Sequence, residues 1–222
     1  MNGPAHGLQA ALSEGRVFRY VALGDSYTIG TSVAAHERWP EQLVAALGQE
    51  VPVLAPGAPR LTLVANLGVN GFTSADLIRE GLPALDALAP EFVTMLIGVN
   101  DVVQGVSAAA YEANVVVILD SLLVRFPANR IVTIAIPDYT VTPAGSDFGD
   151  RRQQRGEIVR YNGIMERLSR DRGVVFVDIF DVSSEAAADL SLVAGDGLHP
   201  SGIQYRRWVE RILPVVEGLL RH

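Results

Sequence analysis

Cysteine and lysine are both absent from this chain of 222 residues. Without cysteine there can be no disulfide, no thiolate nucleophile and no cysteine-ligated zinc or iron–sulfur site. All 18 basic residues are arginine, so neither the phosphate-binding lysine of a Walker loop nor a Schiff-base lysine is available. Covalent catalysis in this chain would therefore use a hydroxyl, a carboxylate or a histidine.

Positive charge and long apolar runs are also scarce. The formal net charge is −7, which gives no basic field to attract nucleic acid or an anionic membrane. No apolar run reaches the roughly 20 residues that a membrane-spanning helix needs. Residues 1–15 contain no arginine and no sustained apolar stretch, so they lack both parts of a secretory signal. We expect a cytoplasmic protein whose partner is a small neutral or apolar molecule.

Hydrophobic residues make up 49% of the chain, enough for one sizeable core. We expect a flexible tail at residues 1–15 and a single domain at 16–222. Five nearly continuous apolar runs predict strands that are buried on both faces, at 17–23, 61–67, 92–97, 131–136 and 174–179. Amphipathic patterns predict helices at 39–47, 74–82, 111–123, 158–168 and 205–219.

This alternation predicts an α/β fold of three layers, with helices on both faces of a five-stranded, mostly parallel sheet. The longest irregular stretch is 137–152, which follows the fourth strand. A loop of that length in a compact domain is typically functional or mobile. Within it, Tyr139 and Phe148 could form the wall of a substrate pocket or simply cover the edge of the sheet.

Small and polar residues gather where the predicted strands end. They form four groups, Gly-Asp-Ser at 24–26, Asn-Leu-Gly-Val-Asn-Gly at 66–71, Gly-Val-Asn-Asp at 98–101 and Asp-Gly-Leu-His-Pro at 196–200. The carboxyl ends of parallel strands lie on one edge of the sheet, so these groups should converge there.

The converging residue types suit acyl transfer. A serine hydroxyl needs a base to become a nucleophile, and His199 could take the proton of Ser26. A carboxylate on the same turn, Asp196, could orient the imidazole. Fixed donors must meet the charge that develops on the carbonyl oxygen, and we assign this role to the N–H of Ser26, to Gly71 and to the Asn100 amide.

At these residues the chain resembles the SGNH hydrolases, also called GDSL esterases and lipases. Residues 24–30 look like the family's first block, with Tyr27 where leucine is commonest, and Gly71 looks like the glycine of the second block. Residues 98–101 and 196–200 look like the third and last blocks, so the resemblance covers nearly the whole chain. It implies a flavodoxin-like fold and hydrolysis of esters or thioesters without a metal or an organic cofactor.

Each residue also has a structural interpretation. Ser26 could be only a helix cap, and Gly68 and Gly71 could be turn glycines. We expect structural roles for Asp25, Asp101 and Gly68. Rivals of Asp196 as the orienting acid are Asp178 and Asp181, and a basic cluster that could bind an anion or lie on a solvated helix face comprises Arg151, Arg152 and Arg155.

The leading hypothesis is a serine esterase that acts on carboxylic esters of short or medium acyl chains through an acyl-serine intermediate. A thioesterase or an acyltransferase on the same scaffold is the nearest alternative. A non-catalytic flavodoxin-like binding module is the alternative from another class, and the absence of a Gly-x-Gly-x-x-Gly motif after the first strand speaks against nucleotide binding. A metal-dependent hydrolase is weaker still, because histidine is sparse.

Overall fold

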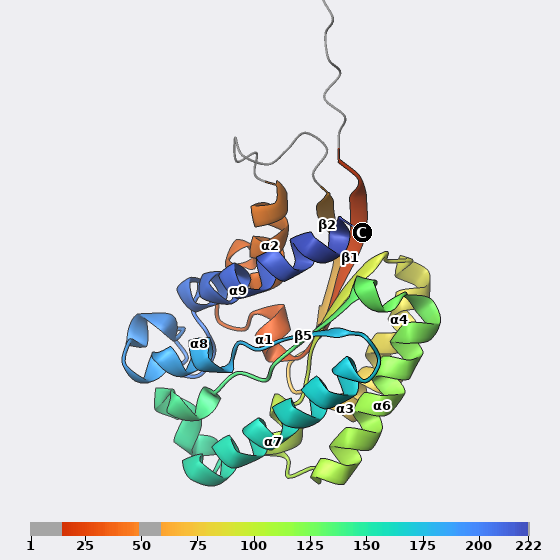
Figure 1. Ribbon diagram of the computed structural model, residues 1–222. Coiled ribbons are helices and arrows are strands. Elements are labelled where there is room, and N and C mark those ends of the chain that lie inside the picture. The colour runs from red at the N-terminus through yellow and green to blue at the C-terminus, as the bar shows by residue number, and fades with distance from the viewer. Residues whose placement is uncertain (1–14, 49–58, 222) are drawn as a thin grey trace, which may run out of the picture.

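A five-stranded parallel sheet forms the centre of the computed structural model, which describes residues 15–48 and 59–221 (Figure 1). The strand order is β2-β1-β3-β4-β5, and every neighbouring pair is parallel. The strands are β1 (Val17–Gly24), β2 (Arg60–Gly68), β3 (Phe92–Leu96), β4 (Ile131–Ile134) and β5 (Val175–Val177). All five predicted strands are therefore confirmed. The expected N-terminal tail at 1–15 lies, apart from Gly15, outside the described residues.

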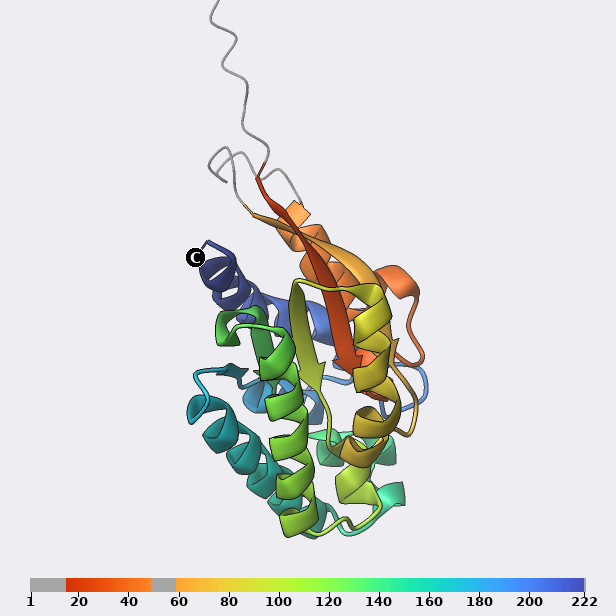
Figure 2. The ribbon, with the colours of Figure 1, turned by 90° about the vertical axis from the view of Figure 1, so that its right-hand side faces the viewer.

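Helices cover both faces of the sheet, as predicted (Figures 1 and 2). One face is covered by α2 (Trp39–Gly48) and α9 (Gly202–Leu220), which pack against each other. The other face is covered by α4 (Leu82–Leu88), α6 (Ala108–Arg125) and α7 (Arg151–Arg170). Four shorter helices lie at or near strand ends, namely α1 (Ser26–Ile29), α3 (Ser74–Asp76), α5 (Val99–Val103) and α8 (Phe180–Ser184).

Two strands end earlier than the apolar runs predict. The backbone of Ile136 does not pair with a strand, because its N–H donates to Asn162 Oδ1 at 2.7 Å and its carbonyl accepts from Asn162 Nδ2 at 2.9 Å. The side-chain amide of a helix residue thus replaces a neighbouring strand and ends β4. At the end of β5, Asp178 Oδ1 accepts from the N–H of Phe180 at 2.8 Å and starts the turn into α8.

Three helical segments replace the single helix predicted at 74–82. They are α3, a π-helical turn over Leu77–Gly81, and α4, and they follow one another without a break. Thr73 caps this run, since its side chain accepts from the N–H of Asp76.

The prediction of an irregular loop at 137–152 is wrong. This stretch contains two 3₁₀ segments, Tyr139–Val141 and Pro143–Phe148, and then the first residues of α7. Asp150 caps α7 by accepting from the N–H of Gln153 at 2.8 Å, so the helix begins seven residues before the predicted 158. Local hydrogen bonds, which leave no periodic signal in a sequence, order the segment.

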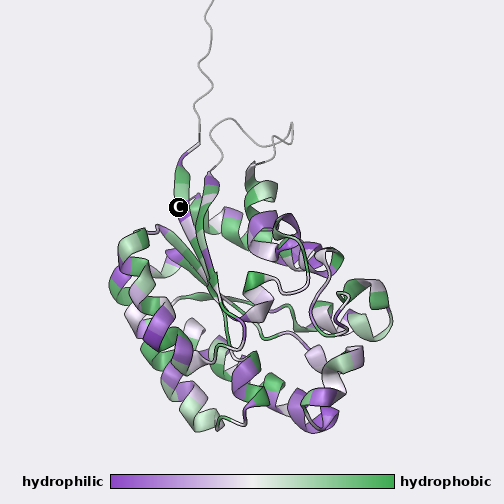
Figure 3. Ribbon diagram, turned by 180° about the vertical axis from the view of Figure 1, so that it is seen from behind, coloured by the Kyte–Doolittle hydropathy of each residue, from purple (hydrophilic) through white to green (hydrophobic). Residues whose placement is uncertain are grey.

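The core lies between the sheet and the two helical layers. Trp39 and Trp208 are fully buried there, as their helical patterns predict. Polar and apolar residues alternate along the outer helices (Figure 3), as expected for helices that bury one side. Among residues 15–48 and 59–221, no helix is long and apolar enough to cross a membrane.

The order of the strands places a topological switch point beside β1. The chain leaves β1 for β2 on one side and then returns past β1 to β3, so the winding reverses between β1 and β3. Open α/β sheets bind their ligands at the carboxyl edge of such a switch point. The described ends of the chain lie at the opposite edge of the sheet (Figure 1), where Arg130 donates to the carbonyl of Leu219 at 2.7 Å.

Candidate active site

Ser26 occupies a tight turn that leaves β1 at the switch point. The side chain of Asp25 caps α1 by accepting from the N–H of Tyr27 at 2.9 Å, and Gly30 ends the helix in the left-handed conformation with φ 69°. At Gly24 an added Cβ would collide with Thr28 and with the carbonyl of Leu96. The turn therefore packs directly against the end of β3, which fixes the position of Ser26.

Asp25 is completely buried behind this turn. Burial raises the pKa of its carboxyl group to about 7, and the nearby charge of Asp101 adds to the effect. Asp25 Oδ2 has no hydrogen-bond partner among the described residues. Asp101 is also buried and accepts from the N–H and the hydroxyl of Ser74. Both aspartates thus make the structural contacts that the sequence predicts for them.

A histidine and an aspartate form a close pair on the loop before α9. His199 Nδ1 donates to Asp196 Oδ2 at 2.6 Å, which leaves Nε2 for the cavity. Asp196 Oδ1 accepts from the N–H groups of Leu198 at 2.9 Å and of His199 at 3.0 Å. Burial opposes the charge on Asp196, but hydrogen bonds from Ser32, Leu198 and His199 outweigh it and hold the pKa of this carboxyl group well below its usual range.

The rival carboxylates are engaged elsewhere. Asp178 accepts from the N–H of Phe180, and Asp181 pairs with Arg211 at 3.1 Å. Asp196 is therefore the carboxylate that contacts His199.

Three donors lie near Ser26 at the predicted positions. Gly71 has φ 83°, a conformation that favours glycine although an added Cβ would meet no atom. Asn100 Nδ2 donates one hydrogen to the carbonyl of Phe72 at 2.9 Å, which holds the amide and leaves its second hydrogen unused. Among the described residues, neither the N–H of Gly71 nor that of Ser26 donates to an acceptor. All three groups are free to meet a ligand oxygen.

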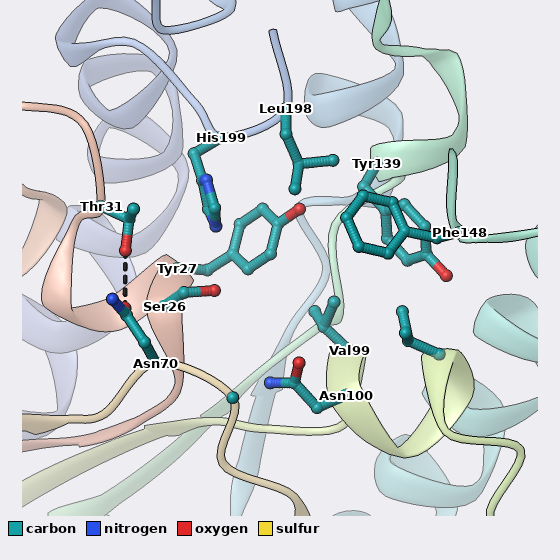
Figure 4. Close-up of a pocket in the computed structure, with 12 residues that line it drawn as sticks. Ser26, Tyr27, Thr31, Asn70, Val99, Asn100, Tyr139, Phe148, Leu198 and His199 are labelled. Atoms are coloured by element: carbon teal, nitrogen blue, oxygen red, sulfur yellow. Dashed lines mark hydrogen bonds between the residues drawn. The ribbon is translucent and has the colours of Figure 1, made fainter. Parts of the chain in front are cut away.

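These groups surround one cavity of about 240 Å³ (Figure 4). Ser26 and His199 both face it, and the Ser26 hydroxyl makes no hydrogen bond with any described residue. The polar side of the cavity carries Thr31, whose hydroxyl donates to Asn70 at 2.7 Å. The apolar side is formed by Tyr27, Val99, Val103, Tyr139, Phe148 and Leu198.

Tyr139 and Phe148 line the cavity wall, and their contact with substrate stays a prediction. Their rings meet edge to face, with centroids 6.2 Å apart. The basic cluster does not line the cavity: Arg155 pairs with the buried Asp138 and lies over the ring of Phe180, and Arg151 donates to the carbonyl of Thr142.

Several cavity residues were missed by the sequence reasoning. Asn70 directly precedes Gly71 and Leu198 directly precedes His199, so their nearness to the motif residues was a usable signal. Thr31 and Val103 carry no such signal, because their place in the cavity depends on how the turns after β1 and β3 pack. No group of three or more histidine, aspartate or glutamate side chains in the described part of the chain could hold a metal ion.

Ser26, His199 and Asp196 beside free oxyanion donors, at the carboxyl edge of a flavodoxin-like sheet, are the groups that an ester-bond hydrolase needs. A family model identifies the group within that class. Residues 22–207 match the GDSL-like Lipase/Acylhydrolase family, and the chain belongs to this family. The resemblance predicted from the four motifs is therefore confirmed.

Solved structures of similar fold include several esterases. Axe2, an acetylxylan esterase from Geobacillus stearothermophilus, is 20% identical with a TM-score of 0.69, over 91% of this chain and 95% of its own. LAE5, an alpha/beta hydrolase from the metagenome of Lake Arreo, is 22% identical with a TM-score of 0.69, over 94% and 97%. The psychrotrophic esterase EstA from Pseudoalteromonas is 17% identical with a TM-score of 0.66, over 92% and 99%. At these identities the likeness shows a shared fold. No curated protein matches the chain significantly by sequence.

Proposed function

We propose that the protein is a serine esterase that hydrolyses carboxylic esters of short or medium acyl chains through an acyl-Ser26 intermediate. The observation that carries this proposal is the contact of His199 with Asp196 at the cavity that also contains Ser26. Family membership supplies the reaction class, and the geometry supports the roles proposed for these residues.

In the first half of the reaction, Ser26 Oγ attacks the carbonyl carbon of the ester while His199 Nε2 takes the hydroxyl proton. Asp196 stabilises the imidazolium that results. The negative charge moves to the carbonyl oxygen, where the N–H groups of Ser26 and Gly71 and the Asn100 amide donate to it. The bond to the alcohol oxygen then breaks, and His199 delivers the proton to the leaving alcohol.

In the second half, water replaces the alcohol. His199 takes a proton from the water, whose oxygen attacks the acyl carbon of the ester to Ser26. The carboxylic acid leaves as the proton returns to Ser26 Oγ. Each half-reaction uses the same donors and the same base, so one set of residues is sufficient for both.

The shape of the cavity supports a limited acyl length. Its apolar side suits a short hydrocarbon chain, and Phe148 at 36% exposure stands where the wall meets solvent. Axe2, whose fold is similar, is an acetylxylan esterase, and the acetyl group is a short acyl group. Thr31 and Asn70 offer hydroxyl and amide groups that would suit a polar leaving alcohol.

Labelling by a fluorophosphonate, with the site mapped by mass spectrometry, tests the nucleophile. We expect one label on Ser26 of the folded protein and no hydrolysis of aryl acetates by Ser26→Ala. A folded protein that takes no label and hydrolyses no ester contradicts the proposal and favours a binding module. A Ser26→Ala variant that retains activity also contradicts it, because another group would then be the nucleophile.

A panel of aryl esters of increasing chain length tests the substrate range. We expect kcat/KM to fall once the acyl chain exceeds the cavity. Matched oxygen and sulfur esters, followed by added alcohols, separate the esterase from the thioesterase and acyltransferase alternatives. A thioester preference or transfer to alcohol in place of hydrolysis would replace the ester assignment without changing the roles of the residues.

A further inference from the structure

Ser32 makes a hydrogen bond that joins two distant parts of the active site. Its hydroxyl donates to Asp196 Oδ2 at 2.6 Å, and the two residues are 164 positions apart in the sequence. The same oxygen accepts from His199 Nδ1 at 2.6 Å. Ser32 lies two residues after Gly30, on the segment that leaves the Ser26 turn. The bond therefore links the segment of the nucleophile to the loop of the acid and the base.

The other donors to Asp196 are local. Oδ1 accepts from the N–H groups of Leu198 and His199, and Oδ2 accepts from the His199 ring. All three donors belong to the loop that carries Asp196 itself, so they hold the carboxylate relative to that loop only. Within the described parts of the chain, Ser32 is the donor to Asp196 that comes from elsewhere.

The backbone of Ser32 adopts an unfavourable conformation. Its φ is 67°, and the one other non-glycine residue with positive φ among the described residues is Ala89, with φ 44°. Ala89 ends α4, where a left-handed residue is a common helix stop, and its N–H donates to the carbonyl of Leu85 at 3.0 Å. Ser32 ends no helix but occupies the third position of the Gly30–Val33 turn, in which the N–H of Val33 donates to the carbonyl of Gly30 at 3.4 Å. Turns with positive φ at that position normally carry glycine there, so serine is held in a conformation that it adopts at a cost. Strain of this kind persists only where the surroundings fix it.

The neighbouring residue is fixed as well. Thr31 donates to Asn70 Oδ1 at 2.7 Å, on the segment that carries Gly71. The short segment after α1 is thus attached through Thr31 to the segment of Gly71, and through Ser32 to the loop that carries Asp196 and His199.

We propose that Ser32 is a positioning residue, which acts through Asp196 to hold the His199 ring at the correct place beside Ser26. The inference rests on the proposed function, because it assigns Ser32 to the reaction of the same site. Without the hydroxyl, Asp196 Oδ2 would turn toward water. The His199 ring, which donates to the same oxygen, would then no longer be held in one orientation. Proton transfer would then slow, whereas the cavity walls that bind the ester would stay in place.

The first test uses Ser32→Gly, which removes the hydroxyl and relieves the positive φ. We expect kcat for an aryl acetate to fall about tenfold, the size expected for the loss of one hydrogen bond to a charged group. KM should stay within about twofold, because the cavity walls are unchanged. The melting temperature should fall only slightly, because relief of the positive φ offsets part of the lost hydrogen bond and of the added entropy of the unfolded chain.

Ala89→Gly is the matched control. It relieves positive φ at the other such residue, far from the cavity, so it should leave kcat unchanged. A Ser32→Gly variant with the kcat of the starting protein overturns the proposal. So does a variant whose KM rises as strongly as its kcat falls, since that would indicate a general distortion of the cavity.

A double-mutant cycle tests whether the effect passes through Asp196. The readout is the rate at which a fluorophosphonate labels Ser26, which can be followed in slow variants. Ser32→Gly should slow labelling in the starting protein and cause no further loss in an Asp196→Ala background. An equal loss in both backgrounds overturns the role of Ser32 as a positioning residue.

The two proposals can fail separately. If Ser26→Ala is inactive while Ser32→Gly keeps full activity, the proposed function stands and the role of Ser32 is wrong. If Ser26 takes no label and Ser26→Ala stays active, both proposals are wrong.

Discussion

The amide of Asn100 lies beside Ser26 with one hydrogen already committed to the carbonyl of Phe72. That bond fixes the amide, so its second hydrogen can meet a developing oxyanion without reorganisation. We predict that Asn100→Ala lowers kcat by about 10²- to 10³-fold, the usual effect of removing one oxyanion donor. Steady-state kinetics on an aryl acetate, with circular dichroism to verify the fold, measure this. An unchanged kcat in the folded variant would remove Asn100 from the group of donors.

The buried carboxyl group of Asp25 makes the stability of the protein depend on pH. Burial raises the pKa of its carboxyl group from 3.8 to about 7, so between these values the folded protein holds a proton that the unfolded chain has released. The free energy of unfolding therefore falls as pH rises through this window. The contribution of protonated Asp25 to the free energy of unfolding is fully present below pH 3.8, the pKa in the unfolded chain, and is lost as the pH rises to about 7, the pKa in the folded protein.

We predict that Asp25→Asn weakens this dependence on pH. Asparagine stays neutral and keeps an oxygen to accept from the N–H of Tyr27. Relative to the starting protein, the variant should gain on the order of 3 kcal/mol in stability between about pH 4 and about pH 8. Urea unfolding of both proteins across this range measures the gain. Parallel curves for the two proteins would show that Asp25 titrates alike in the folded and unfolded states.

At the scale of elements, the end of β2 controls the turn that carries Ser26. The sequence indicates a turn glycine at position 68, and this interpretation is wrong. Gly68 is the last residue of β2, and an added Cβ would collide with the N–H of Ile29 and the carbonyl of Asp25. Glycine is needed there because α1 packs directly on the strand.

We predict that Gly68→Ala displaces α1 and lowers kcat more than about tenfold, with a loss of about 1–3 kcal/mol in stability from overpacking. Gly163→Ala is the matched control, because Gly163 lies on the exposed side of α7 with open space around its Cα. Alanine in a helix interior should there raise stability by about 0.5–1 kcal/mol and leave kcat unchanged. Thermal unfolding and kinetics of both variants test the comparison. Full activity in Gly68→Ala would mean that α1 tolerates the added carbon.

The same scale shows why sequence reasoning succeeded for some elements and failed for others. The strands were predictable because each is an apolar run, and the meeting of Ser26, Gly71, Asn100 and His199 followed from the shared edge of a parallel sheet. The early end of β4 could not be predicted, because it depends on the side-chain amide of Asn162, and a single amide produces no periodic pattern in the sequence. The bond from Ser32 to Asp196 was missed for a related reason: it is a single contact between residues far apart in the chain.

For the whole molecule, the elements that carry the site differ in how firmly they are held. Ser26 and Asn100 follow central strands, whereas Asp196 and His199 lie on a loop with one isolated bridge, between Val193 and Pro200. Many hydrogen bonds of that loop are internal, such as the one from the N–H of Ala194 to the carbonyl of His199 at 2.7 Å. Its long-range hydrogen bonds include those from Ser32 to Asp196 and from the N–H of Ala144 to the carbonyl of Gly197. Segments with few long-range contacts open before the core does.

We predict that urea abolishes activity at a lower concentration than it unfolds the sheet. Hydrolysis of an aryl acetate and far-UV circular dichroism, recorded on the same samples, give the two midpoints. Coincident midpoints would show that the loop with Asp196 and His199 unfolds only together with the core.

The ends of the described chain lie at the edge of the sheet opposite the cavity (Figure 1). A fluorescent label or a solid support attached at Gly15 or Arg221 would therefore stand away from the entrance that the ester must use. Immobilisation through either of these two described positions should accordingly leave access to the cavity unobstructed.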